Sequence, residues 1–128
     1  MADIVWEGAK EFQQWLRETP NVAVRDVEAA LMVEGEQIMG VSKRATPVDT
    51  GNLRGTGHVK IPKTAGGVTT VVLAYGTDYA IYVHEMIYLS HKNGWAKFLE
   101  GACMAAQEGF GNRMKKRVLD KIGGRGGW

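Results

Sequence analysis

The sequence predicts an α+β domain, in which a small antiparallel β-sheet packs against long N-terminal and C-terminal helices. Apolar residues recur at spacings of three and four in the first 45 residues and again from residue 95 to residue 122. Between these stretches, β-branched residues gather in short runs separated by glycine and proline, which is typical of a hairpin plus a further short strand. We expect one domain over residues 1–122 and a flexible glycine-rich tail over residues 123–128.

Two helices are expected before the sheet. Residues 4–18 have the spacing of a short amphipathic helix, which ends at Thr19 because a residue before proline is pushed out of the helical region. Residues 22–45 predict a second, longer helix that Pro47 stops. Only Glu34 interrupts the apolar repeat of this second helix.

The middle of the chain has strand-like patterns. Residues 58–61 alternate polar and apolar side chains, residues 68–74 are rich in β-branched ones, and the loop between them contains glycine, so we expect a β-hairpin. Residues 79–84 predict either a third strand or a short helical turn, because their periodicity does not decide between the two. Residues 86–94 contain several turn-forming residues and are expected to form a loop.

One long final helix is expected over residues 95–122. Apolar residues recur at every fourth position along it, namely Ala102, Ala106, Phe110, Met114, Val118 and Ile122. Gly101, Gly109 and Gly111 each weaken a helix by up to about 1 kcal/mol relative to alanine. Their small size can instead permit close packing, either against the second helix or against a neighbouring subunit.

Composition indicates a globular protein and argues against several classes. Hydrophobic residues make up 45% and charged residues 23%, and the formal net charge of +2 is too small to indicate nucleic acid by itself. The single cysteine can form no intrachain disulfide. We find no signal-peptide pattern and no apolar run approaching the ~20 residues that span a bilayer. We therefore expect a soluble intracellular product with no membrane contact.

For the residues that could take part in catalysis, the sequence context favours structural roles. His84, Glu85 and His91 are residue types that bind zinc, but their spacing matches no metal motif, and a polar strand end beside a polar loop explains them better. Cys103 could pair with either histidine as a nucleophile, yet it lies among small residues in the last helix, where a free cysteine is commonly a buried apolar residue. The glycine-rich segments lack the context of a phosphate loop. We expect no metal, no cofactor, no small-molecule substrate and no enzyme activity.

Asp49 and Thr50 could be considered as an acid and a hydroxyl nucleophile. No partner base stands at a meaningful spacing from them. Aspartate side chains commonly stabilise turns through local backbone hydrogen bonds, so we expect Asp49 to cap a short turn that runs from Thr50 to Arg54.

A basic cluster marks the C-terminal region, where six Lys and Arg residues between positions 113 and 125 are accompanied only by Asp120. Such a cluster can contact phosphates, and it can equally form a solvated helix face or bind an acidic patch on a partner subunit. The alternative function that it indicates is a small basic nucleic-acid-binding module built from the last helix and the tail. The candidate residues for phosphate or partner contact are Lys115, Lys116, Arg117 and Lys121.

A combination of segments resembles a known family. A long helix ends in Ala45-Thr-Pro-Val-Asp-Thr-Gly-Asn-Leu-Arg54 and is followed by the hairpin and by Tyr75-Gly-Thr-Asp-Tyr-Ala-Ile-Tyr-Val-His-Glu85. The segment Ala96-Lys-Phe-Leu-Glu100 then begins the last helix. Over residues 22–122 this order resembles the tail-completion family of long-tailed double-stranded DNA phages, which includes minor capsid, neck and head–tail joining proteins.

The resemblance implies a structural virion protein, made in the host cytoplasm, that assembles with itself as a ring at the head–tail junction. The ring would be sixfold or twelvefold and would complete or join the tail. Its partners would be neighbouring head-connector and tail-tube or tail-terminator proteins, with nonspecific contact to passing DNA. Asp49, Thr50, Gly51, Leu53 and Arg54 would hold the turn between helix and sheet. Tyr79, Tyr82, His84 and Glu85 would lie near a subunit contact.

Overall fold

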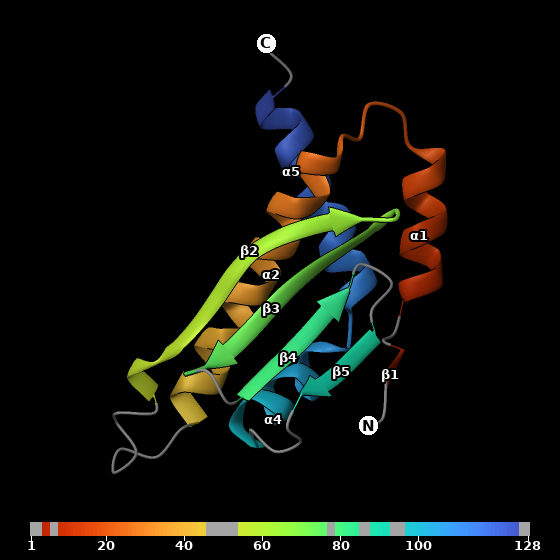
Figure 1. Ribbon diagram of the computed structural model, residues 1–128. Helices are drawn as coiled ribbons and strands as arrows, with labels where there is room; N and C mark the ends of the chain where they lie inside the picture. The colour runs from red at the N-terminus through yellow and green to blue at the C-terminus, as the bar shows by residue number, and fades with distance from the viewer. Residues whose placement is uncertain are drawn as a thin grey trace.

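The protein has the predicted α+β architecture (Figure 1). The computed structural model describes residues 4–5, 8–45, 54–76, 79–84, 88–92 and 97–125. A five-stranded antiparallel sheet, in the order β1-β5-β4-β3-β2, forms one layer. In Figure 1 the helices α2, α4 and α5 lie behind this sheet, and α1 stands beside it.

The first predicted helix begins too early. Residues Ile4–Val5 form a short strand, β1, which pairs with β5, and the helix α1 spans Ala9–Glu18. Gly8 separates the two elements with a φ angle of 82°. This left-handed conformation cannot continue a right-handed helix, so a single helix from residue 4 is excluded.

The second predicted helix is confirmed as α2, which spans Val24–Ala45. Asp26, in its first turn, accepts a 2.8 Å hydrogen bond from the Ala23 backbone N–H and so satisfies a donor that the start of a helix leaves open. Gly35 faces the sheet, and a Cβ atom there would lie 3.1 Å from Val59 Cγ1 and 3.4 Å from Val71 Cγ2. The helix therefore packs very closely on the hairpin.

The predicted hairpin is confirmed as β2, Gly57–Ala65, and β3, Val68–Tyr75. The two glycines that connect them have φ angles of 58° and 78°, which suit a tight turn between antiparallel strands. The pairing register shifts between Lys60 and Lys63. Pro62 lies in this irregular stretch of a terminal strand, where its missing N–H is tolerated.

Two further strands complete the sheet. Residues Tyr79–His84 form β4, so the choice between strand and helical turn is settled for a strand. The loop predicted for residues 86–94 is wrong over Tyr88–Lys92, which form β5 between β4 and β1. Ser90 and His91 favoured a loop locally, but ladder hydrogen bonds with a strand on each side outweigh that preference.

The single final helix predicted for residues 95–122 is wrong, because the structure has two helices. Helix α4 spans Lys97–Ala106 and helix α5 spans Phe110–Arg125. The break lies at Gly109, whose φ angle of 71° is incompatible with a continuous helix. Helix α5 also continues past residue 122, so Gly123–Arg125, expected to begin a flexible tail, are helical. Residues 126–128 of the expected tail lie outside the described residues.

The core lies between the helices and the face of the sheet that they cover. Its largest fully buried apolar side chains come from both layers, namely Phe12, Leu31, Leu73, Tyr75, Leu99, Phe110 and Met114. Helix α1 joins this core by crossing the start of α5 at very short range, since a Cβ atom on Gly111 would lie 2.7 Å from the Gly8 carbonyl oxygen. Gly111, which was expected to permit close packing against the second helix or a neighbouring subunit, instead packs closely against the start of α1.

Candidate functional site

The predicted turn can be located only through its flanks. Asp49, Thr50, Gly51 and Leu53 lie outside the described residues, whereas Arg54 is described and half-buried. Helix α2 leads into this segment, and strand β2 follows it. In the sequence, the predicted turn thus stands between the end of α2 and the edge strand β2.

The contact between the end of α2 and the sheet is built from five residues, which we call the α2–sheet joint: Met39, Ser42, Lys43, Gly57 and Tyr75. The hydroxyls of Ser42 and Tyr75 are hydrogen-bonded at 2.7 Å, and both side chains are buried. A Cβ atom on Gly57 would lie 2.7 Å from Lys43 Cε, 2.7 Å from Tyr75 Cε1 and 3.0 Å from Met39 Sδ. Only glycine fits at this position without moving its neighbours.

The predicted subunit-contact residues belong to an interior strand. Tyr79, Tyr82 and His84 lie in β4, where they pair with Tyr75, Val72 and Thr70 of β3. Glu85 lies outside the described residues. Because β5 pairs with β4 on its other side, another subunit cannot add a strand to β4. A contact through β4 would have to use the face of the sheet.

The fold places the two histidine candidates on neighbouring strands. His84 lies in β4, and His91 lies in β5, where its backbone pairs with Ile81. Within the described ranges, no three His, Cys, Asp or Glu side chains gather in a way that could hold a metal ion. Cys103 is fully buried, and burial raises the pKa of its thiol, with the charges of Glu34 and Glu100 acting in the same direction. A thiol kept neutral in this way is a poor nucleophile.

Glu34, which interrupts the apolar repeat of α2, is the most buried charged side chain among the described residues. Glu34 is 2% exposed, and α5 supplies two guanidinium groups to it. Arg113 donates from Nη2 to Glu34 Oε2 at 2.7 Å and from Nε to Oε1 at 3.2 Å. Arg117 donates from Nη2 to Glu34 Oε1 at 3.2 Å and to Gln37 Oε1 at 2.6 Å. We call Glu34, Gln37, Arg113 and Arg117 the Glu34 cluster.

Part of the predicted basic cluster is therefore internal. Arg117 was expected to contact phosphates or a partner, but its guanidinium is paired with Glu34 and its side chain is only 16% exposed. Lys116 and Lys121 are exposed, and Lys115 is half-buried. The sequence signal for this arrangement was Glu34 itself, since a carboxylate on an apolar helix face calls for a cationic partner. Nothing local identified that partner, which lies 79 and 83 residues further along the chain.

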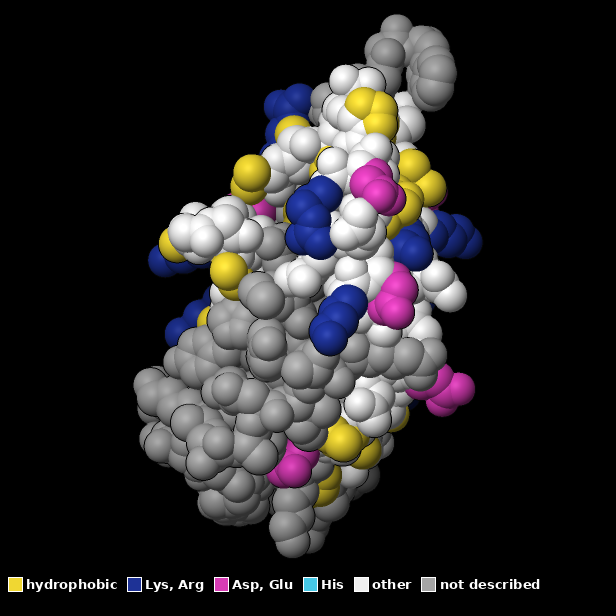
Figure 2. All heavy atoms as spheres, turned by 90° about the vertical axis from the view of Figure 1, so that its right-hand side faces the viewer, with side chains coloured by type: hydrophobic (Ala, Val, Ile, Leu, Met, Phe, Trp, Pro, Cys, Tyr) yellow, Lys and Arg dark blue, Asp and Glu magenta, His cyan; other side chains and the backbone are white. Residues whose placement is uncertain are grey.

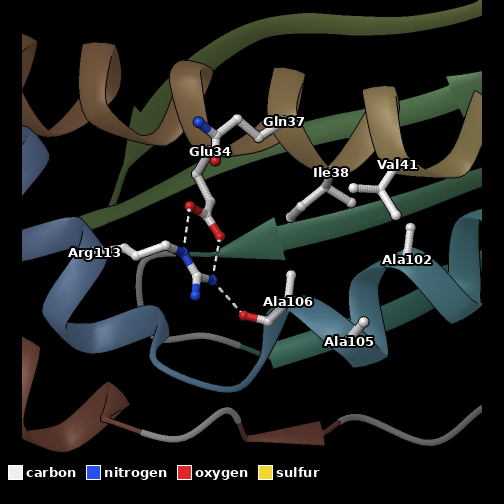
Figure 3. A pocket seen from close by; sticks show the side chains of 8 residues that line it. All are labelled: Glu34, Gln37, Ile38, Val41, Ala102, Ala105, Ala106 and Arg113. Atoms are coloured by element: carbon white, nitrogen blue, oxygen red, sulfur yellow. Dashed lines mark hydrogen bonds and ion pairs between the residues drawn. The ribbon is translucent and has the colours of Figure 1, made fainter.

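An open groove lies beside the Glu34 cluster, between α2 and α4 (Figure 3). Its volume is about 230 Å³. Ile38 and Val41 point from α2 toward Ala102 of α4, and the Glu34–Arg113 ion pair closes one end. The remaining lining residues are Gln37, Ala105 and Ala106. The small alanine side chains of α4 leave room for this groove between the two helices.

The surface that carries α1 shows no single sign of charge. Lys and Arg side chains are interspersed with Asp and Glu side chains over the described part of this face (Figure 2). On α1 itself, Glu18 and Arg17 each bond to Gln14, so opposite charges share one polar neighbour. A strongly basic docking face is therefore not found on this side. No described helix is both long enough and apolar enough to cross a membrane.

Comparison with known proteins gives one result. The family model described as bacteriophage HK97-gp10, putative tail-component, matches residues 9–84, which is more than half of the chain. No curated protein and no solved structure matches the chain. The matched region runs from α1 to the end of β4 and so contains the whole α2–sheet joint. The chain belongs to the HK97-gp10-like family of bacteriophage tail components, and is thereby a virion protein.

Proposed function

We propose that this protein is a structural subunit of the phage neck or tail that forms a ring at the head–tail junction and completes or joins the tail there. The observation that carries the proposal is the family match, because it covers the helix, the hairpin and the joint that fixes one against the other. The protein would act by binding neighbours and not by catalysis. The buried Cys103 thiol agrees with that role.

A ring requires two different surfaces on each subunit, because a heterologous head-to-tail contact must close on itself. We propose β4 as one of them, with Tyr79, Tyr82 and His84 of that strand and Glu85, which follows it in the sequence, near the subunit contact. The turn residues Asp49, Thr50, Gly51, Leu53 and Arg54 would set the direction in which the chain leaves the α2–sheet joint. We propose sixfold symmetry, with twelvefold as the alternative, and contacts to the head connector on one side and to the tail tube or tail terminator on the other.

The exposed edge of the sheet supports controlled assembly. The side chain of Ile61 on β2 is 81% exposed, which by itself favours uncontrolled strand addition. The flanking Lys60 and Lys63 are charged and exposed, Pro62 cannot donate a backbone hydrogen bond, and the register shifts between the two lysines. These features discourage edge-to-edge pairing. A subunit built in this way stays in solution until it meets the neighbour that fits it.

DNA contact is proposed only as a minor, sequence-independent role. The candidates are Lys115, Lys116 and Lys121. Arg117 differs from them because it forms an ion pair with Glu34, and the described residues show no such pair for the three lysines. Reversing the charge of the two exposed lysines, Lys116→Glu with Lys121→Glu, would leave assembly intact if the role is structural. Loss of a salt-dependent affinity for double-stranded DNA in this variant, together with failure to bind any phage particle, would favour the nucleic-acid-binding alternative.

Phage particles made without this protein provide the direct test. Purified protein is added to separated heads and tails from such a preparation, and joined particles are counted by negative-stain electron microscopy. We expect joining to rise with protein concentration to a plateau. Two variants accompany the wild type: Gly57→Val disrupts the α2–sheet joint and should abolish joining, whereas Gly101→Ala, at an open position, should not. If wild-type protein binds neither heads nor tails, the proposal is wrong.

A further inference from the structure

The boundary between α4 and α5 is a break in a sequence that is patterned as one helix. The apolar residues at every fourth position continue from Ala102 through Ala106 and Phe110 to Met114. The helices nevertheless stop and restart around Gly109, which has a φ angle of 71°. A Cβ atom at that position would also lie 3.4 Å from Arg113 Nη1. The backbone therefore bends where Arg113 lies against it.

Arg113 connects three elements through one guanidinium group (Figure 3). It donates to both carboxylate oxygens of Glu34 on α2. It also donates from Nη2 to the Ala106 carbonyl and from Nη1 to the Glu108 carbonyl, the latter at 2.5 Å. Carbonyls at the end of a helix have no partner within that helix. Arg113 thus binds the end of α4 from its position in the first turn of α5.

Arg117 provides a natural contrast within the same cluster. Its guanidinium donates to Glu34 and to Gln37, both of which lie on α2. Among the described residues, no hydrogen bond joins Arg117 to α4. Both arginines therefore hold α5 to α2 through Glu34, but only Arg113 also holds α4.

An open groove runs between α4 and α2 next to this point. Its volume is about 230 Å³, and it is lined on the α4 side by Ala102, Ala105 and Ala106. Leu99 and Cys103, by contrast, are fully buried in the core. Helix α4 therefore rests on α2 through a short run of core residues, and the carbonyls at its C-terminal end are held by a charged side chain that α5 carries.

We propose that α4 is a hinged lid, that residues 107–109 are its hinge, and that Arg113 is the clasp that keeps the lid closed on α2. The closed form is the ground state because Leu99 and Cys103 are buried in it. In the open form α4 leaves α2, and the apolar surface around Ile38 becomes accessible. Arg113 is a positioning residue in this scheme. The inference concerns the fold alone and does not depend on ring assembly.

The single cysteine of the chain is a built-in reporter of the lid. Cys103 lies on α4 and is fully buried, so a thiol reagent such as DTNB reaches it only when α4 opens or the whole protein unfolds. The rate of labelling is measured under native conditions in wild type, Arg113→Gln and Arg117→Gln. We expect Arg113→Gln to speed labelling at least tenfold relative to Arg117→Gln. Equal rates in the two variants, or no acceleration by Arg113→Gln, would overturn the proposal.

If Arg113→Gln fails to fold, a measurement on the wild-type protein alone still tests whether α4 opens locally. Local opening exposes little surface, so its rate depends weakly on urea, whereas global unfolding has the full urea dependence. We expect Cys103 labelling at low urea to be at least tenfold faster than global unfolding allows, and nearly independent of urea. Labelling that follows the global unfolding equilibrium at every urea concentration would show that α4 opens only when the whole domain unfolds, and the lid would be rejected.

Discussion

The α2–sheet joint and the α4–α5 corner fix their helices in different ways. By the corner we mean the break at residues 107–109 together with the Glu34 cluster that holds it to α2. At the joint, neutral groups fit tightly, with Gly57 enclosed by its neighbours and the Ser42 and Tyr75 hydroxyls bonded in the interior. At the corner, the buried charge of Glu34 is shared by two arginines beside an open groove. The family match contains the whole joint, but of the corner it contains only Glu34 and Gln37 on α2, since it ends at residue 84. The joint therefore depends on close packing of neutral groups, whereas the corner depends on charge pairing between distant parts of the chain.

The largest expected effect is at the corner. Glu34→Ala removes the carboxylate that Arg113 and Arg117 share and leaves their charges partly buried without an anion. We expect a loss of about 3–5 kcal/mol in the free energy of unfolding, nearer the lower figure because Arg113 is one third exposed. Urea unfolding followed by circular dichroism measures it. Glu36→Ala, an exposed neighbour on the same helix, is the control and should change stability by less than about 0.5 kcal/mol.

The joint should respond to added volume. Gly57→Ala places a methyl group 2.7 Å from the Tyr75 ring and from Lys43, and only the lysine can move aside easily. We expect a cost of about 1–3 kcal/mol, which is typical of overpacking. Gly55→Ala, two residues earlier and facing open space, is the matched control. Equal stability of the two variants in thermal melts would show that the joint is looser than this packing implies.

The joint could be predicted from the sequence better than the corner could. The helix α2 and the hairpin were predictable because their period, Pro47 and the paired glycines are local signals. The corner was not predictable, because the partners of Glu34 lie 79 and 83 residues away in the sequence and the apolar repeat continues across the break between α4 and α5. Gly109 was noted as a weak point in a helix, but its left-handed backbone depends on tertiary contacts.

Strand β5 and the start of the first helix differ from the prediction for separate reasons. Ser90 and His91 have weak strand preference and predict a loop, but pairing on both sides stabilises β5 as a strand. The early start assigned to the first helix overlooked the left-handed Gly8. In the candidate site, Tyr75 was expected to be one member of a family motif, and its hydrogen bond to Ser42 could not be derived from spacing.

A smaller effect is expected from the hydrogen bond at the joint. Tyr75→Phe removes the hydroxyl bonded to Ser42 while keeping the buried ring. We expect a loss of about 1 kcal/mol, the usual net value of one internal hydrogen bond. A double-mutant cycle with Ser42→Ala measures the coupling between the two residues. A coupling energy of zero would mean that the hydroxyl pair contributes nothing to holding α2 on the sheet.

The smallest effect has the opposite sign and lies on α4. Gly101 is an exposed interior position of that helix, and a Cβ atom there meets open space. Gly101→Ala should raise the free energy of unfolding by about 0.5–1 kcal/mol, because alanine has the higher helix propensity. The shift in melting temperature measures it. A decrease would indicate that this side of α4 contacts something in the folded protein.

The central claim, that this protein is a neck or tail subunit, is tested most directly by immunogold electron microscopy of purified phage particles. The account predicts gold particles at the head–tail junction of intact virions, with the label absent from particles made without the protein. Purified virions that carry no label and contain none of this chain by mass spectrometry would contradict the claim.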